Sequence, residues 1–142
     1  MLLIHPLVQA GAILLALYVL YLGLNRLASL HLGRKTDFKW RRHVLLGQIV
    51  ILAWLAGLAG GLYTVKSYWR AYLITGYHAR VGLAMLPFLA FGLVSGLYLH
   101  RVRRRRRVLP FFHGLNNLTL IVLALIQVWL GVGVYHSFVL GN

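Results

Sequence analysis

Cysteine is absent from this chain of 142 residues, and its acidic side chains are reduced to a single aspartate. Without a thiol the chain forms no disulfide, no iron–sulfur cluster and no thiolate metal site. Covalent attachment of haem through a C-x-x-C-H motif is excluded for the same reason. The one acid, Asp37, lies between two apolar runs rather than inside one. The runs therefore contain no carboxylate for acid–base catalysis or for proton pumping.

Apolar residues dominate what remains. They make up 61% of the chain, and the mean hydropathy is +0.78, which indicates that lipid surrounds most of it. Four runs of 22 or 23 residues contain one formal charge, Arg80, which lies close enough to a run's end to snorkel to the membrane surface. We predict an all-α, integral membrane four-helix up-down bundle, a single transmembrane domain over residues 1–142. Its helices are expected at about 2–24, 43–65, 78–99 and 113–135.

The fifteen basic residues are concentrated in two loops. The loop after the first run carries six of them, and the loop after the third run carries six more, including the arginine run 103–107. Short loops rich in lysine and arginine stay in the cytoplasm, so we expect both termini outside, in the inner (plasma) membrane of a prokaryote. The arginine run directly follows a span, where anionic lipid headgroups explain it, and we expect no nucleic-acid partner.

Four of the seven histidines stand at the starts of the four runs: His5, His43, His78 and His113. An ionisable side chain at membrane depth is costly and marks a functional candidate, and imidazole is a common ligand of metals and haem iron. Consecutive helices run antiparallel, so His5 and His78 share the outer level, whereas His43 and His113 share the inner level. We therefore predict two pairs of haem iron ligands, each drawn from alternate helices.

A glycine follows each of these histidines after 18 residues, which is five helical turns and about 27 Å along the same face. At the outer level the two histidines should face Gly61 and Gly131, and at the inner level Gly23 and Gly96. We expect these glycines, with Gly47 and Gly82 one turn after a histidine, to leave room for a flat macrocycle. Asn117 lies one turn after His113, where we expect it to hydrogen-bond the haem edge or a ring nitrogen. The alternative is that the glycines only allow close helix packing and that the histidines only contact lipid headgroups.

Several motifs in this pattern are shared with a known family. They are His43-x3-Gly47, Thr75-Gly76-x-His78-x3-Gly82, and His113-x2-Asn116 followed by Gln127 and Gly131. The chain resembles the cytochrome b561 superfamily over nearly its whole length, and most of all its small prokaryotic four-helix relatives. The resemblance implies two haems b, the outer held by His5 and His78 and the inner by His43 and His113. The fifth and sixth helices of that family are absent, as is a clear ascorbate-binding motif.

Haem iron with two histidine ligands has no open coordination position, so it suits electron transfer. We predict a di-haem cytochrome that carries electrons between an outer and an inner haem, with no catalytic acid or base of its own. Its expected partners are membrane lipid, quinone or a docked redox protein, and further subunits of an oligomer or a larger redox complex. The expected partners of the haem propionates are Arg42, Arg101 and His100 inside, and Lys66 and Arg80 outside.

Two alternatives remain open from the sequence. In the first, one haem is held by His43 and His113, and the outer histidines serve a quinone in a membrane anchor subunit. In the second, the protein binds no haem and acts as a metal transporter or as an assembly protein of the membrane. Histidine-only sites can hold zinc or copper, but ligands at opposite levels of the membrane lie too far apart to share one ion.

Overall fold

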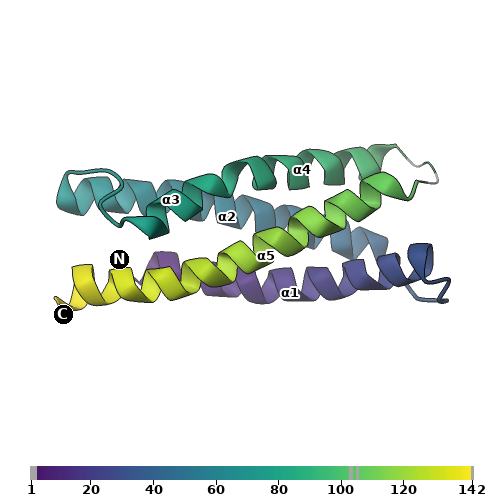
Figure 1. The fold of residues 1–142 in the computed structure, drawn as a ribbon, viewed down its shortest axis with the longest axis horizontal. Helices are drawn as coiled ribbons and strands as arrows, with labels where there is room; N and C mark the ends of the chain where they lie inside the picture. Colours follow the sequence, from purple (N-terminus) through teal and green to yellow (C-terminus); the bar gives the residue numbers. More distant parts are fainter. Residues whose placement is uncertain (1–2, 103, 105, 142) are drawn as a thin grey trace.

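Four long helical spans make up almost all of the chain (Figure 1). The computed structural model describes residues 3–102, 104 and 106–141. The elements are α1 (Ile4–His31), α2 (Trp40–Trp69), α3 (Tyr77–Ala84), α4 (Leu86–Arg101), α5 (Val108–Tyr135) and a final π-helical turn, η1 (His136–Leu140). Each span is long and apolar enough to cross a membrane. The predicted fold class, an all-α four-helix membrane bundle, is confirmed.

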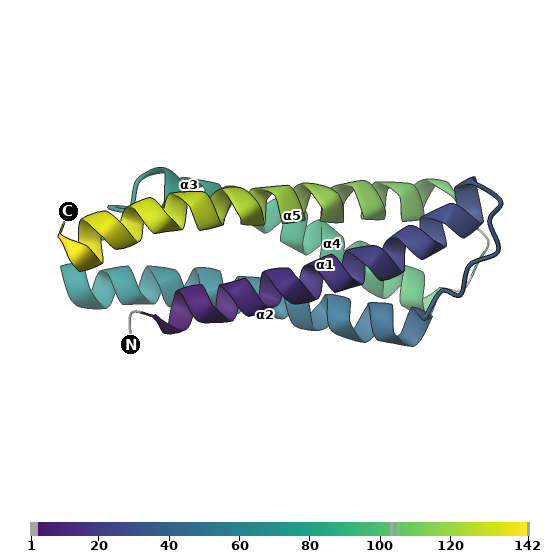
Figure 2. The same cartoon turned by 90° about the horizontal axis from the view of Figure 1, so that it is seen from below.

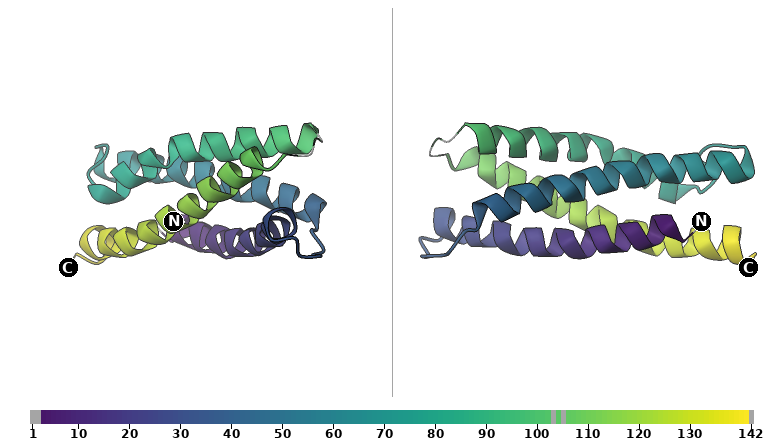
Figure 3. Two further views of the ribbon diagram at one scale, coloured as in Figure 1. Left: turned by 45° about the vertical axis from the view of Figure 1, so that its right-hand side comes forward. Right: turned by 180° about the vertical axis from the view of Figure 1, so that it is seen from behind.

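The spans are arranged so that each contacts two neighbours. Helix α1 packs against α2 and α5, while α4 packs against the same two helices on the other side. The α3–α4 span therefore lies diagonally opposite α1, and α2 lies diagonally opposite α5. Both termini lie at one end of the bundle, and the two basic loops lie together at the other end (Figures 1 and 2). Figure 3 shows that the spans cross one another at an angle rather than running strictly parallel.

The third span differs from its prediction. The sequence predicted one helix over 78–99, but α3 ends at Ala84 and α4 begins at Leu86. Pro87 explains the interruption, because it has no N–H to donate to the carbonyl one turn earlier. The backbone of Met85 keeps a right-handed helical conformation and donates to carbonyls of α3, so the two segments cross the membrane as one rod.

The helices also extend beyond the predicted spans. Helix α1 continues to His31, and α2 runs from Trp40 to Trp69. Hydropathy marks the hydrocarbon layer, whereas helical hydrogen bonding continues through the headgroup region until a residue breaks it. Arg70 stops α2 in the left-handed conformation at φ 56°. The loop after α1 is held by Thr36, whose hydroxyl donates to the Asn25 carbonyl at 2.6 Å.

The buried core forms a belt halfway along the bundle, between the two histidine levels. Its members lie seven, eight or eleven residues after one of the four histidines, so the fourfold pattern of the sequence continues into the packing. They are Ala12, Ile13, Ala16, Val50, Ile51, Trp54, Met85, Leu89, Leu120, Ile121 and Ala124. Lipid tails are as apolar as these side chains, so the belt stabilises the bundle through close packing rather than through removal from water.

Candidate functional site

The two histidine pairs predicted from the sequence meet across the diagonals of the bundle. At the end with the termini, His5 of α1 and His78 of α3 have ring centroids 6.3 Å apart, with ring planes at 81°. At the end with the basic loops, His43 of α2 and His113 of α5 have centroids 6.4 Å apart, with planes at 71°. The two ends of the bundle thus contain nearly the same ring geometry.

The separation of the rings corresponds to a simple coordination geometry. Two imidazoles that bind one metal ion from opposite sides have ring centres about 6.3 Å apart, given metal–nitrogen bonds of about 2.0 Å. Both pairs match this value, at 6.3 and 6.4 Å. Among the described residues, no group of three or more His, Cys, Asp or Glu side chains gathers in a way that could hold a metal ion. Each pair could supply two ligands to an ion, and the remaining positions would have to be filled by another molecule.

Each imidazole packs against a glycine of a neighbouring helix. A Cβ added to Gly61, Gly23 or Gly131 would lie 3.3 Å from the Cε1 of a histidine ring, and one added to Gly96 would lie 3.2 Å away. The histidines concerned are, in the same order, His5, His43, His78 and His113. The facing residues are those that the 18-residue step predicted. The space is filled by the imidazole ring itself, whereas the sequence argument assigned it to a macrocycle.

The other predicted packing positions have different neighbours. A Cβ at Gly47 would meet Val19 at an ordinary 3.7 Å, and one at Gly82 would meet the Gln127 amide at 2.8 Å. The Asn117 amide nitrogen donates to the His113 carbonyl at 2.7 Å and lies 3.2 Å from Nε2 of the same ring. Asn117 thus contacts the nitrogen that a metal ion would use.

The rings of His43 and His113, the pair that the sequence analysis expects at the inner level, have contacts at Nδ1. The Nδ1 of His43 donates to the Val19 carbonyl at 3.2 Å. Val19 lies one turn before Gly23, the glycine against which this ring packs. The Nδ1 of His113 lies 2.8 Å from the hydroxyl oxygen of Ser95. A ring that donates from Nδ1 keeps the lone pair of Nε2 free for a metal ion. In both rings Nε2 is therefore the nitrogen left for a metal ion, although the Asn117 amide contacts that of His113.

The rings of His5 and His78, the pair expected at the outer level, pack against glycines but lack a well-formed hydrogen bond at Nδ1 to any described residue. The Nδ1 atoms of His5 and His78 are buried, and no hydrogen-bond partner for them lies within the described part of the chain. The backbones of Gly57 and Gln127 lie beside them, in positions equivalent to Val19 at the inner level, without a well-formed hydrogen bond. The outer rings therefore pack against glycines as the inner rings do, but hydrogen bonds at Nδ1 orient them less firmly.

Four further polar residues lie close to these rings: Gln9 and Ser95, which had no part in the sequence argument, and Asn116 and Gln127, which entered it only through the family resemblance. Ser95 contacts His113, and three amide side chains donate to backbone carbonyls of facing helices. The three are Gln9 to Ala53 at 3.2 Å, Asn116 to Phe88 at 3.0 Å and Gln127 to His78 at 2.9 Å. Each accepting carbonyl lies one turn before a glycine, where no Cβ hinders access. An amide or hydroxyl inside an apolar run was the available signal.

The predicted propionate partners lie at the expected ends of the bundle, next to aromatic rings in three cases. His100 stacks on Trp40 with centroids 4.9 Å apart. Lys66 lies 4.7 Å above the ring of Tyr72, and Arg80 lies 5.7 Å above Tyr77. Arg42 and Arg101 are exposed at the end with the basic loops.

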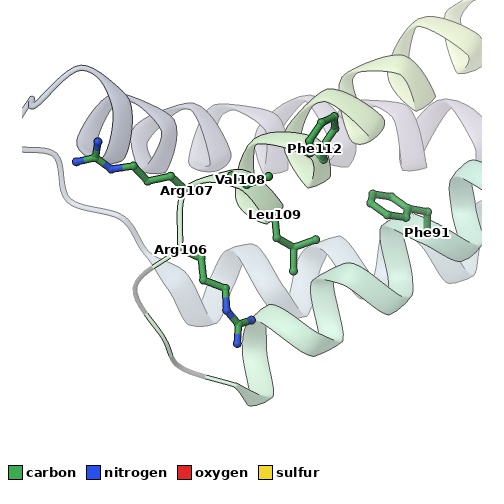
Figure 4. Close-up of a pocket in the computed structure, with 6 residues that line it drawn as sticks. All are labelled: Phe91, Arg106, Arg107, Val108, Leu109 and Phe112. Atoms are coloured by element: carbon green, nitrogen blue, oxygen red, sulfur yellow. The ribbon is translucent and has the colours of Figure 1, made fainter.

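A shallow groove of about 620 Å³ lies at the same end, between α4 and the start of α5. Its floor is apolar, formed by Phe91, Leu109 and Phe112, the neighbour of His113. Figure 4 shows Arg106 and Arg107 pointing in different directions from the loop above this floor. Arg106 lies 4.6 Å above the ring of Tyr98. The groove therefore combines an apolar floor with a cationic rim near the inner histidine pair.

Comparison with known proteins gives no relative: no protein-family model, no curated protein and no solved structure matches this chain.

Proposed function

We propose that this chain is a di-haem b-type membrane cytochrome of the cytochrome b561 kind, which transfers single electrons across the membrane. His5 and His78 would hold the outer haem, and His43 and His113 the inner one. The observation that carries the proposal is the pair of imidazoles on each diagonal, at 6.3 and 6.4 Å. Haem accounts for two-ligand sites, because its macrocycle supplies the four remaining nitrogens around iron.

The residues of each site fit such a group. The four glycines that face the rings let each imidazole lie against a helix backbone, where a side chain would displace it. At the inner level the Val19 carbonyl accepts from Nδ1 of His43 and the Ser95 hydroxyl contacts Nδ1 of His113, so Nε2 is the nitrogen that each ring would offer to iron. Haem bound by two histidines supplies one-electron chemistry without an open position for oxygen. The absence of carboxylates from the apolar runs agrees with electron transfer rather than proton pumping.

The belt of buried residues between the two levels has a part in this function. Its tightly packed apolar side chains, including Trp54 and Leu120, exclude water from the middle of the bundle. An apolar core without water separates the two sites and prevents ions from leaking across the membrane during electron transfer. The chain itself therefore provides two binding sites and an insulated medium between them.

The charge distribution supports an orientation in the membrane. The two basic loops lie together at the His43–His113 end (Figure 1). By the positive-inside rule this end faces the cytoplasm, and the termini lie outside the plasma membrane of a prokaryote. The pair His5–His78 is then the outer one, as the sequence argument expected.

Electrons require a donor and an acceptor at the two faces. The groove lined by Phe91, Leu109 and Phe112 provides an apolar surface for a quinone ring, with arginines at its rim as hydrogen-bond donors. The basic loops provide a surface for an acidic redox protein. Because the chain has little mass outside the membrane, we propose that it acts in an oligomer or as a subunit of a larger redox complex.

Haem content tests the proposal directly. The purified protein should show a Soret band and an α band that change reversibly with dithionite. A pyridine haemochrome assay should give two haems b per chain. A preparation that lacks haem, and that does not take up added haem, would contradict the proposal and favour a metal transporter or an assembly protein.

A single haem per chain would support a second candidate, an anchor subunit with one inner haem and an outer quinone site. The contrast at Nδ1 favours this candidate over other single-haem arrangements, because both inner rings have a Nδ1 partner, whereas the outer rings have no well-formed one among the described residues. Replacement of His113 by leucine would then remove all haem, whereas replacement of His78 would remove none.

A further inference from the structure

Ser95 is a polar side chain in an unusual position. It is 4% exposed, in the middle of α4, on the side that faces the inner histidine pair. Its hydroxyl donates to the Phe91 carbonyl one turn earlier, so its only proton is already used. The oxygen therefore presents lone pairs to the Nδ1 of His113 at 2.8 Å, and the imidazole is the donor in that contact.

The other inner ring uses a different acceptor. His43 donates to a backbone carbonyl, that of Val19, which lies one turn before the glycine seating the ring. The equivalent carbonyl for His113 is that of Gly92, one turn before Gly96, and the Ser95 hydroxyl occupies the space beside it, 3.4 Å away. The acceptor for His113 is thus a side chain, whereas the acceptor for His43 is a backbone carbonyl. A substitution at Ser95 can therefore remove this acceptor without altering the backbone.

We propose that Ser95 is a positioning residue of the inner haem, which fixes the ring of His113 and sets the midpoint potential of that haem through its contact with Nδ1. The inference rests on the proposed function. An acceptor on Nδ1 makes the imidazole more electron-donating toward iron, which favours the ferric state and lowers the potential. Among the described residues no side-chain hydroxyl contacts Nδ1 of His5 or His78, so Ser95 contributes to a difference in potential between the two levels.

The experiment compares S95A with the unaltered chain by redox titration of the purified, haem-loaded protein. S95A should retain two haems, and the midpoint potential of one should rise. At a fixed solution potential we expect a change of roughly tenfold in its ferric-to-ferrous ratio, about 59 mV for a one-electron couple. The paramagnetic resonance signal of the same ferric haem should change. H113L, which lacks the inner haem, identifies which signal belongs to it.

The matched control is T64A. Thr64 donates to the carbonyl of Gly60 one turn earlier at 2.8 Å, as Ser95 does to Phe91, but this contact is exposed to the surroundings. T64A removes a hydroxyl with the same backbone contact and should leave both potentials unchanged. S95T restores a hydroxyl and should return the inner potential toward its original value, which a role in packing alone does not predict.

The outcomes separate the two proposals. A chain without haem would contradict the proposed function and this inference together. Two haems with unchanged potentials in S95A would overturn this inference alone. If S95A does not retain the inner haem, S95C supplies the test, because its thiol keeps the side-chain volume but accepts hydrogen bonds weakly. S95C should then show the same upward shift, and an unchanged potential would overturn the inference.

Discussion

The outer and inner ends of the bundle contain the same arrangement of rings with different surroundings. Both have two imidazoles on a diagonal at nearly equal separation, and both seat each ring on a glycine. At the inner end a carbonyl and a hydroxyl fix the Nδ1 atoms, and Asn117 contacts a Nε2. At the outer end the Nδ1 atoms are buried beside the backbones of Gly57 and Gln127, without a well-formed hydrogen bond to any described residue.

Two features of the sites vary independently of each other: the placement of the rings against the glycines, and the hydrogen-bond partners of Nδ1. The separation of the ring centroids and the glycine that faces each ring repeat with the fourfold pattern of the sequence. They are therefore the features that the two sites have in common. The partners of Nδ1 do not repeat. Since such partners orient a ligand and tune the metal it holds, we expect the two ends to differ in how firmly they hold haem and at what potential.

Removal of a ligand has the largest expected effect. H113L should abolish the inner haem and H78L the outer haem, each leaving one haem per chain, because each pair lies at its own level of the membrane. Haem per chain by pyridine haemochrome, together with the shape of the α band, measures this. Loss of neither haem would show that the imidazole pairs are not ligands. Loss of both from a folded single variant would show that the levels are not independent.

Substitution of a glycine that faces a histidine has the next largest expected effect. In G131V a Cβ would lie 3.3 Å from Cε1 of His78, and its two methyl groups would push the ring out of line. We expect a loss of roughly 10- to 100-fold in outer haem affinity, the size seen when the support of a metal ligand is removed. The matched control is G133V on the same helix, where an added Cβ meets nothing within 4 Å. Equal losses in the two variants would contradict a seat at Gly131.

Much of this site was predictable because it depends on helix geometry alone. Hydropathy located the four spans, and antiparallel order assigned His5 and His78 to one level. Five turns of helix separate each histidine from a glycine on the same face, so the facing of Gly131 and His78 followed from the spacing. These features survive small errors at helix ends, because they depend on turns counted within one helix.

The remaining features depend on side-chain placement, which spacing does not determine. A glycine in a helix indicates a close approach, but the periodicity does not tell whether a ring of the protein or a macrocycle approaches. Ser95 precedes Gly96 and looked like an ordinary small residue of a membrane helix. Its contact with His113 depends on the crossing of α4 and α5 and on the rotamer of the hydroxyl. Pro87 was visible, but its effect at Met85 depends on local hydrogen bonds.

Rates of haem loss should sharpen the contrast between the ends. The outer rings have no well-formed hydrogen bond at Nδ1 to any residue that the structure describes, so the outer haem should leave first, roughly tenfold faster than the inner one. A time course of haem transfer to an excess of a haem-scavenging protein measures both rates. H78L and H113L, with one haem each, identify the phases. A slower outer phase would show that the missing hydrogen bonds at Nδ1 do not weaken that site.

The smallest expected effect concerns Asn117. Its amide contacts Nε2 of His113 at 3.2 Å, so iron must displace this contact before it binds the ring. A hydrogen bond of this kind contributes about 1 kcal/mol, so N117A should raise inner haem affinity by roughly fivefold and leave the outer site unchanged. Haem titration of the apoprotein in an H78L background isolates the inner site. A fall in affinity would instead indicate that the Asn117 amide stabilises bound haem. The inner site would then differ from the outer one by this contact as well as by the hydrogen bonds at Nδ1.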